Sequence, residues 1–177
     1  MNKSKNRFRR LIYLIVTVLF IGGSLIPAYC QEGPGKMPSF SGGTGTQEDP
    51  YLISTAADLL AFSEVGWDAN YMEAYYKLTG NIDLGENTWN PVGINGPPFS
   101  GTFDGNGKTI TLRKIADSRN MGLFGSTDRR SSIKNLTVSG QISKIISSGE
   151  EVCFGLIAAR AEGSIENCIT EGSVDLS

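Results

Sequence analysis

An internal repeat constrains the fold of this chain more than any other feature of its 177 residues. The segment GLFG at 122–125 is followed by IKNLTVSGQI from Ile133, and GLIA at 155–158 is followed by IENCITEGSV from Ile165. Isoleucine, asparagine and glycine recur 32 residues apart in the two longer runs. A period of about 20 to 50 residues is typical of solenoids, in which each unit buries its apolar face on the next. We therefore expect neighbouring coils to place equivalent residues side by side.

The stretch before the repeat predicts short strands. Apolar and polar residues alternate over 75–78 and, after a Gly80-Asn81 turn, over 82–84. Asp104-Gly105-Asn106-Gly107 then predicts a tight turn with positive φ angles, which glycine and asparagine adopt most readily. Alternation resumes over 108–115. Strands this short, separated by glycine and asparagine, indicate an all-β fold.

One short helix is expected ahead of the strands. Thr55 and Asp58 have the spacing of a capping box, in which each side chain bonds the backbone of the other residue. Gly66 is a natural stop for the helix. Its expected buried side consists of Leu59, Leu60, Phe62 and Val65. We expect this helix to cap the N-terminal end of the stack.

Five segments in chain order resemble the GLUG-repeat proteins of bacteria. They read GGTGTQEDPYLISTAADLLAF, YYKLTGNIDL, FSGTFDGNGKTI, MGLFG and IKNLTVSG, and the resemblance covers roughly residues 41–174. The resemblance implies a right-handed parallel β-helix-like stack, found in large cell-surface and secreted bacterial proteins and beside the catalytic region of some immunoglobulin A peptidases. Two features depart from the family pattern: Ala158 stands in place of a glycine, and the chain holds only about two repeats.

The first thirty residues differ in kind from the rest. A basic start, an apolar run over 11–26 and the pair Ala28 and Cys30 form the three parts of a secretory signal peptide, with cleavage expected near Gln31. An uncleaved membrane anchor is the alternative, because residues 11–29 are about long enough to span a bilayer. A lipidated Cys30 is a third interpretation, against which the preceding tyrosine argues. The sequence thus predicts a secreted or cell-surface protein.

Composition divides the remainder into a leader and a domain. Residues 31–47 are rich in glycine and proline and predict a flexible leader, and 48–177 hold the β-helix domain. Without residues 1–30 the chain keeps 11 basic and 18 acidic residues, a net charge of about −7. Nucleic acid and anionic lipid both favour clustered lysine and arginine. We therefore expect no nucleic-acid partner.

No residue pattern predicts catalysis. The chain has no histidine, which is the commonest general base and transition-metal ligand. Two carboxylate pairs, Asp83 with Glu86 and Asp58 with Glu64, fall at turn and cap positions where a solvated surface explains them. The loop at 104–107 has the composition of a calcium loop but lacks the twelfth-position glutamate of an EF-hand. We expect no catalytic residue, no cofactor and no metal.

Asn135 and Asn167 occupy equivalent places, where a side-chain amide can bond its own backbone and the asparagine one coil away. Strand parity then directs Leu136 and Cys168 inward. Cys168 is expected to be a small buried hydrophobe, with a disulfide to Cys153 as the alternative. The residues expected to be structural are Asn135, Asn167, Gly122, Gly125, Gly155, Asp104, Gly105, Asn106 and Gly107.

Two functions are compatible with this pattern. The first is an exported structural and interaction module, in which a stiff β-helix serves as a spacer or adhesion scaffold for an unidentified polysaccharide or protein. The second is a carbohydrate-active β-helix enzyme, or its non-catalytic arm. Aromatic residues pack in cores or form sugar-binding platforms, and the aromatic-rich part of the chain contains Trp67, Tyr71, Tyr75, Tyr76 and Trp89.

The last repeat predicts an open end. The coil that holds Ile165, Cys168 and Val174 has no atypical polar unit after it in this sequence. It is therefore expected to present unpaired strand edges and an uncovered apolar end, which invite association. Three outcomes are compatible with such an end: further repeats of a longer chain cover it, a second copy covers it, or the last coil frays. We expect further repeats, because repeat folds normally finish with an atypical unit.

Overall fold

A computed structural model describes residues 39–65, 68–144 and 149–176. The expected signal peptide, with Ala28 and Cys30, lies outside the described residues. The described elements, in chain order, are β1 (Tyr51–Ile53), α2 (Ala56–Glu64), α3 (Ala69–Met72), β2 (Tyr75–Leu78), β3 (Ile82–Asp83), β4 (Thr88–Trp89), β5 (Thr102–Leu112), β6 (Lys114–Ile115), β7 (Asn120–Met121), β8 (Phe124–Ser126), β9 (Ser132–Lys144), β10 (Cys153–Phe154), β11 (Ala158–Arg160), β12 (Ser164–Glu166) and β13 (Ile169–Leu176).

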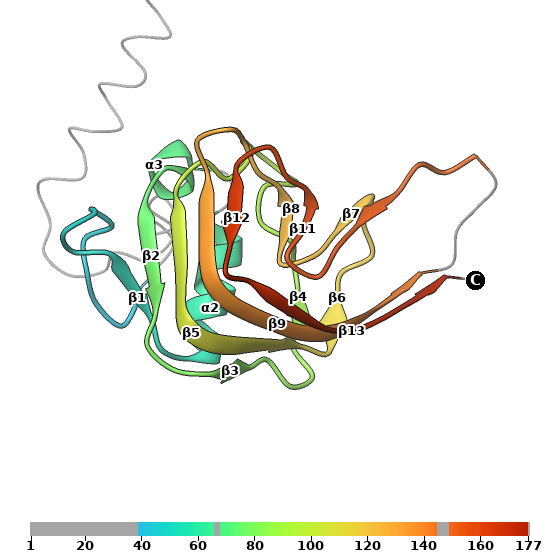
Figure 1. Ribbon diagram of the computed structural model, residues 1–177, viewed down its shortest axis with the longest axis horizontal. Helices are drawn as coiled ribbons and strands as arrows, with labels where there is room; N and C mark the ends of the chain where they lie inside the picture. Colours follow the sequence, from blue (N-terminus) through green and yellow to red (C-terminus); the bar gives the residue numbers. More distant parts are fainter. Residues whose placement is uncertain (1–38, 66–67, 145–148, 177) are drawn as a thin grey trace, which may run out of the picture. The chain divides into compact units, whose positions relative to one another are not determined.

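The strands form a parallel β-helix of about three turns, which confirms the predicted all-β fold class. The main sheet has the order β1-β2-β5-β9-β12, with β13 also on β9 and β3 on β5, and every pair in it is parallel. These strands lie side by side in chain order (Figure 1). Three two-stranded parallel sheets, β4 with β6, β7 with β10 and β8 with β11, complete the coils. Each coil therefore returns to lie on the one before it.

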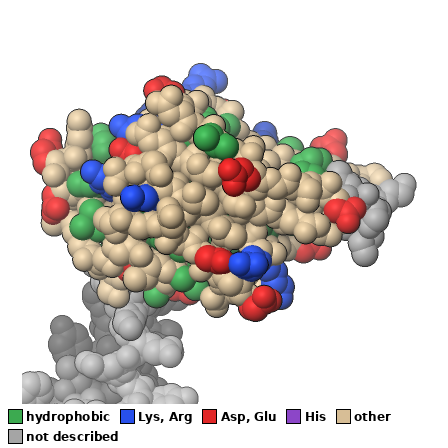
Figure 2. Space-filling model, turned by 60° about the horizontal axis from the view of Figure 1, so that its bottom comes forward, with side chains coloured by type: hydrophobic (Ala, Val, Ile, Leu, Met, Phe, Trp, Pro, Cys, Tyr) green, Lys and Arg blue, Asp and Glu red, His purple; other side chains and the backbone are tan. Residues whose placement is uncertain are grey.

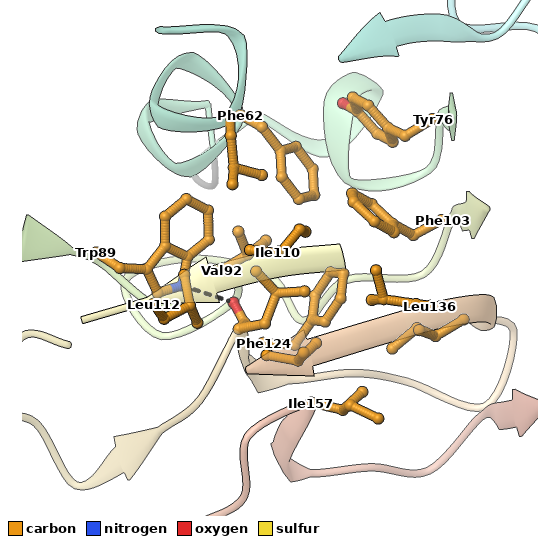
Figure 3. Close-up of a cluster of buried hydrophobic side chains, with 14 of the residues drawn as sticks. Phe62, Tyr76, Trp89, Val92, Phe103, Ile110, Leu112, Phe124, Leu136 and Ile157 are labelled. Carbon is orange, nitrogen blue, oxygen red and sulfur yellow. Dashed lines mark hydrogen bonds between the residues drawn. The ribbon is translucent and has the colours of Figure 1, made fainter. Parts of the chain in front are cut away.

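The core fills the inside of the coils. Inward residues of β5 and β9, such as Phe103, Ile110 and Val138, are 0% exposed. They belong to one cluster with Phe62, which reaches in from α2 (Figure 3). The capping box of Thr55 and Asp58 is present, as predicted. On the predicted apolar side of the helix Leu59, Phe62 and Val65 are buried and Leu60 is half-buried.

The predicted tight turn at Asp104–Gly107 is a bend within one strand. Asn106 and Gly107 have the expected positive φ angles, 51° and 69°. However, β5 runs on through them, with a register shift against β9 between Asp104 and Lys108. The chain does not reverse because the neighbouring strands on both sides are parallel to β5. The correct description is therefore a β-bulge at a corner of the coil.

The predicted leader is wrong for residues 39–47, and residues 31–38 lie outside the described part. The Ser41 N–H donates to the Leu52 carbonyl at 3.1 Å, and the Leu52 N–H donates to Gly42 at 2.8 Å. The Phe40 ring lies 4.7 Å from that of Tyr51 between centroids. A glycine- and proline-rich composition argues against regular structure, but these hydrogen bonds hold an irregular segment against β1.

Asp58 ties this segment to the helix. Its Oδ2 atom accepts from Ser41 Oγ at 2.7 Å and from the N–H groups of Ser54 and Thr55 at 2.9 Å. Burial by itself raises the pKa of this carboxyl group, but the hydrogen bonds from Ser41, Ser54 and Thr55 outweigh it and hold the pKa below its ordinary value. The ionised form is therefore the one that stabilises the fold.

Replacing Asp58 with asparagine should lower the free energy of unfolding by about 1–3 kcal/mol at pH 7, because hydrogen bonds to a charged acceptor are lost. A depressed folded-state pKa contributes stability above the unfolded value of about 4, and that contribution is lost as the pH falls through the folded value. The difference in the free energy of unfolding between the original chain and the Asp58→Asn variant should therefore become smaller below about pH 4, as measured by urea titrations. Glu64→Gln, an exposed change on the same helix, is the control. A gap that is independent of pH would contradict the assignment.

Candidate functional site

The outer face of the main sheet carries a polar hollow of about 580 Å³. Side chains alternate across a strand, so the neighbours of the buried Tyr76, Phe103 and Ile133 point outward. The hollow lies over β2, β5 and β9 beside the segment that precedes β1. Its lining includes Gln47, Glu48, Tyr75, Lys77, Thr102, Asp104, Ser132 and Lys134. This surface offers hydrogen bonds, charges and one half-buried aromatic ring to a ligand.

A row of alternating charges crosses this face. Lys77 is the register partner of Asp104, and Asp104 is the partner of Lys134. Lys134 is in turn the partner of Glu166 on the last coil. Opposite charges on neighbouring strands attract each other. We call Lys77, Asp104, Lys134 and Glu166 the charge ladder.

Sequence reasoning missed the charge ladder. The 32-residue repeat already aligns Lys134 with Glu166, and this signal was available. Lys77 and Asp104 lie outside the recognisable repeat. The bulge after Asp104 also changes the spacing between coils, so their register follows only from the structure.

The predicted asparagine stack is present next to the ladder. Asn135 Nδ2 donates to Asp104 Oδ1 at 3.1 Å, and Asn167 Nδ2 lies 3.4 Å from Asn135 Oδ1. Both asparagines have positive φ angles, 53° and 51°. A carboxylate only accepts, so Asn135 must direct its amide toward Asp104 and its oxygen toward the next coil. Asp104 also accepts from the Asn106 N–H at 2.8 Å, and thus joins the corner residues.

The two residues that follow the asparagines point inward. Leu136 is 1% exposed, and Cys168 is half-buried and packs on the core. Burial raises the pKa of the Cys168 thiol. Cys168 and the exposed Cys153 are both free, so the disulfide alternative is wrong.

The predicted glycines of the repeat, Gly122, Gly125 and Gly155, are required for space. Gly122, Gly125 and Gly155 are not among the residues with positive φ. A Cβ atom on Gly122 would lie 2.2 Å from the Gly155 carbonyl oxygen on the next coil. One on Gly125 would lie 1.9 Å from Ile94 Cγ2. The repeat glycines therefore set how closely neighbouring segments approach.

The aromatic residues mostly serve the core. Trp89 and Tyr76 are 0% and 1% exposed, and both lie among buried side chains (Figure 3). Trp89 Nε1 donates to the Leu123 carbonyl at 3.0 Å, and the Tyr76 hydroxyl donates to the Tyr71 carbonyl at 2.8 Å. A sugar-binding role is wrong for these two rings. Tyr75 and Tyr71 are half-buried, and Trp67 lies outside the described residues.

One carboxylate of each candidate pair has structural partners. Asp83 forms an exposed ion pair with Arg113, with Oδ2 and Nη2 2.7 Å apart, and this hydrogen bond lowers the pKa of Asp83. Asp58 accepts the structural hydrogen bonds described above. Arg113 lines a second polar hollow, of about 520 Å³, together with Ser139, Gln141 and Glu171. In residues 39–65, 68–144 and 149–176, no three acidic or cysteine side chains converge as a metal-binding group.

Fold and surface together define a parallel β-solenoid with a polar outer face. On the face shown in Figure 2, acidic and basic side chains are scattered and small hydrophobic areas lie between them. No helix among the described residues is long and apolar enough to span a membrane.

No family model matches the chain, and no solved structure matches it. A protein of Evansella cellulosilytica named as a Gly-rich membrane protein is 31% identical over 177 positions, which cover 93% of this chain and 19% of that protein. Halomucin of Haloquadratum walsbyi is 29% identical over 163 positions, which cover 84% of this chain and 2% of that protein. The chain thus corresponds to a small part of each of these relatives.

Proposed function

We propose that this chain is a structural and interaction module of an exported, cell-surface protein. The observation that carries the proposal is the in-register parallel stack with one continuous core, from Phe62 on the helix to Ile157 on a late coil. A solenoid of this kind extends by about 4.8 Å with each added coil and is stiff along its axis, because every coil packs on its neighbours. These are the properties of a spacer or adhesion scaffold.

The names of the similar proteins support a surface location. One relative is called a membrane protein and the other a halomucin, and both are much longer than this chain. The signal-peptide pattern at 1–30 agrees with export. The 32-residue period and the ordered segments support assignment to the GLUG-repeat type.

A non-catalytic role is part of the proposal, and it is supported by how the carboxylates are used. Asp58 accepts from a serine hydroxyl and backbone N–H groups, Asp83 pairs with Arg113, and Asp104 accepts from Asn106 and Asn135. Each of these groups has a structural partner. The half-buried Tyr75 in the larger hollow favours a second candidate, a carbohydrate-binding arm, since an aromatic ring beside polar groups suits a sugar.

We expect a membrane-impermeant amine reagent to label the full chain when the chain is expressed in intact cells of a bacterial host with a single membrane. Such a reagent reaches surface lysines such as Lys114, which is exposed. A variant without residues 1–30 should stay unlabelled and serves as the control. A full chain that remains unlabelled and cytosolic would contradict the proposed location. Turnover of a polysaccharide by the purified chain would contradict the non-catalytic part.

A further inference from the structure

Two rows of side chains run across the floor of the larger hollow. The first row consists of the register partners Tyr75, Thr102 and Ser132, each of which carries a hydroxyl group. The second row, two residues further along the same strands, consists of the first three members of the charge ladder. Strands β2, β5 and β9 lie side by side (Figure 1), so each strand supplies one hydroxyl group and one charged group. Both rows therefore follow the axis of the stack and cross the strands.

The spacing along these rows suits an extended polymer. Neighbouring strands lie about 4.8 Å apart, so equivalent groups recur at that interval along each row. A pyranose chain joined by β-1,4 linkages is an extended ribbon whose sugars follow one another at nearly the same interval, whereas α-1,4 linkages curve the chain into a helix. One sugar of the extended kind therefore fits over each strand, beside one hydroxyl group and one charged group.

The charges of the hollow favour an uncharged polymer. The lining contains two basic residues, Lys77 and Lys134, and two acidic residues, Glu48 and Asp104, so its formal charges cancel. Residues 31–177 contain more acidic than basic residues, and this excess disfavours the approach of an acidic polymer. Ammonium groups donate hydrogen bonds and carboxylates accept them. Together they suit the hydroxyl groups of a neutral sugar, each of which does both.

Most of the polar groups on this floor are free to bond a ligand. The side chains of Tyr75, Thr102 and Ser132 form no hydrogen bond with another residue in the described part of the chain. Within the same residues, Lys77 and Lys134 take part in no ion pair. No buried side-chain nitrogen or oxygen atom of the described residues lacks a partner, so these open groups face solvent.

We propose that this hollow binds an uncharged, linear, β-1,4-linked polysaccharide, which lies along the stack axis across β2, β5 and β9. One sugar ring packs on Tyr75, because an aromatic face suits the C–H face of a sugar. Thr102, Ser132 and the charge ladder bond the hydroxyl groups of the sugars that follow. The inference deepens the carbohydrate-binding candidate proposed above and rests on it, but it does not depend on export.

The test measures binding of labelled oligosaccharides to the purified full chain by fluorescence anisotropy. Cellohexaose is uncharged and β-1,4-linked, and maltohexaose contains the same sugar with α-1,4 linkages. The hexamer of β-1,4-linked mannuronic acid keeps the extended linkage and adds a carboxylate to each sugar. Cellohexaose should bind saturably, and each of the other two should bind about tenfold more weakly, which corresponds to the loss of one or two hydrogen bonds.

Variants of single residues test the position of the polymer. Thr102→Val removes one hydroxyl group from the hollow and should weaken binding of cellohexaose about two- to tenfold, the effect of one lost hydrogen bond. Thr109→Val, the same change on β5 outside the lining, should leave binding unchanged. Tyr75→Ala should weaken binding about three- to tenfold, whereas Tyr75→Phe, which keeps the ring, should retain most of it. Urea unfolding of each variant checks that it is folded.

The possible failures are distinguishable. Tighter binding of the mannuronic acid hexamer would overturn the uncharged ligand, and equal binding of maltohexaose would overturn its extended placement. Equal losses in Thr102→Val and Thr109→Val would overturn the site, because the polymer would then lie elsewhere on the sheet. If none of the three oligosaccharides binds, this inference and the carbohydrate-binding candidate both fail, whereas the exported scaffold is judged by the surface-labelling experiment alone.

Discussion

Replacing Phe62 with alanine should lower the free energy of unfolding by about 3–5 kcal/mol, as for other fully buried phenylalanines. The side chain is 0% exposed. Its ring centroid lies 4.4 Å from that of Tyr76, 5.6 Å from Phe103 and 6.0 Å from Phe124. These neighbours lie on three different strands, β2, β5 and β8, so no single strand can move to close the cavity. The variant should also detach α2 from the first coils.

Urea unfolding followed by tryptophan fluorescence measures this loss, because Trp89 is part of the same core. Phe154→Ala is the matched control: it removes the same atoms from a side chain that is 39% exposed. We expect the control to cost clearly less than Phe62→Ala, because removing a side chain that is 39% exposed leaves no enclosed cavity. Equal losses in the two variants would mean that Phe62 does not hold the helix to the stack.

The sequence predicted those parts of the fold that local signals or the repeat determine. Thr55 and Asp58 act on each other across three residues, so the capping box is visible without any tertiary information. The 32-residue period predicts the register of β9 with β12 and β13, and hence the neighbouring positions of Asn135 and Asn167. In both cases the interacting groups are related by a fixed offset along the chain.

The sequence did not predict features whose interacting groups have no fixed offset along the chain. Residues 39–47 are held by hydrogen bonds to β1, which composition does not reveal. The bulge at Asp104–Lys108 shifts the register between β5 and β9, and so conceals the charge ladder from any constant-period alignment. The burial of Trp89 depends on a carbonyl partner more than thirty residues later, so an aromatic count could not assign it to the core.

Gly105, in the corner at residues 104–107, lies where β5 and β9 approach each other closely. A Cβ atom at this residue would lie 2.5 Å from the Asn135 carbonyl oxygen and 2.6 Å from Leu136 Cα. Both contacts are with the backbone of β9, which cannot turn aside as a side chain could. Gly107, two residues later, has nothing within 4 Å of its position for Cβ, but its φ is +69°. Substitutions at these two glycines therefore distinguish a requirement for space from a requirement for a left-handed backbone.

Gly105→Ala should therefore cost about 3 kcal/mol or more, the upper range for overpacking, because the corner must open or β9 must shift. Gly107→Ala should cost about 1–2 kcal/mol, the penalty for an alanine in the left-handed region. Urea unfolding gives both values, and hydrogen exchange of the β9 amides should rise in the Gly105 variant alone. If Gly107→Ala were the more damaging change, backbone conformation rather than the close approach of β5 to β9 would govern this corner, and the asparagine stack built on it would tolerate a wider coil.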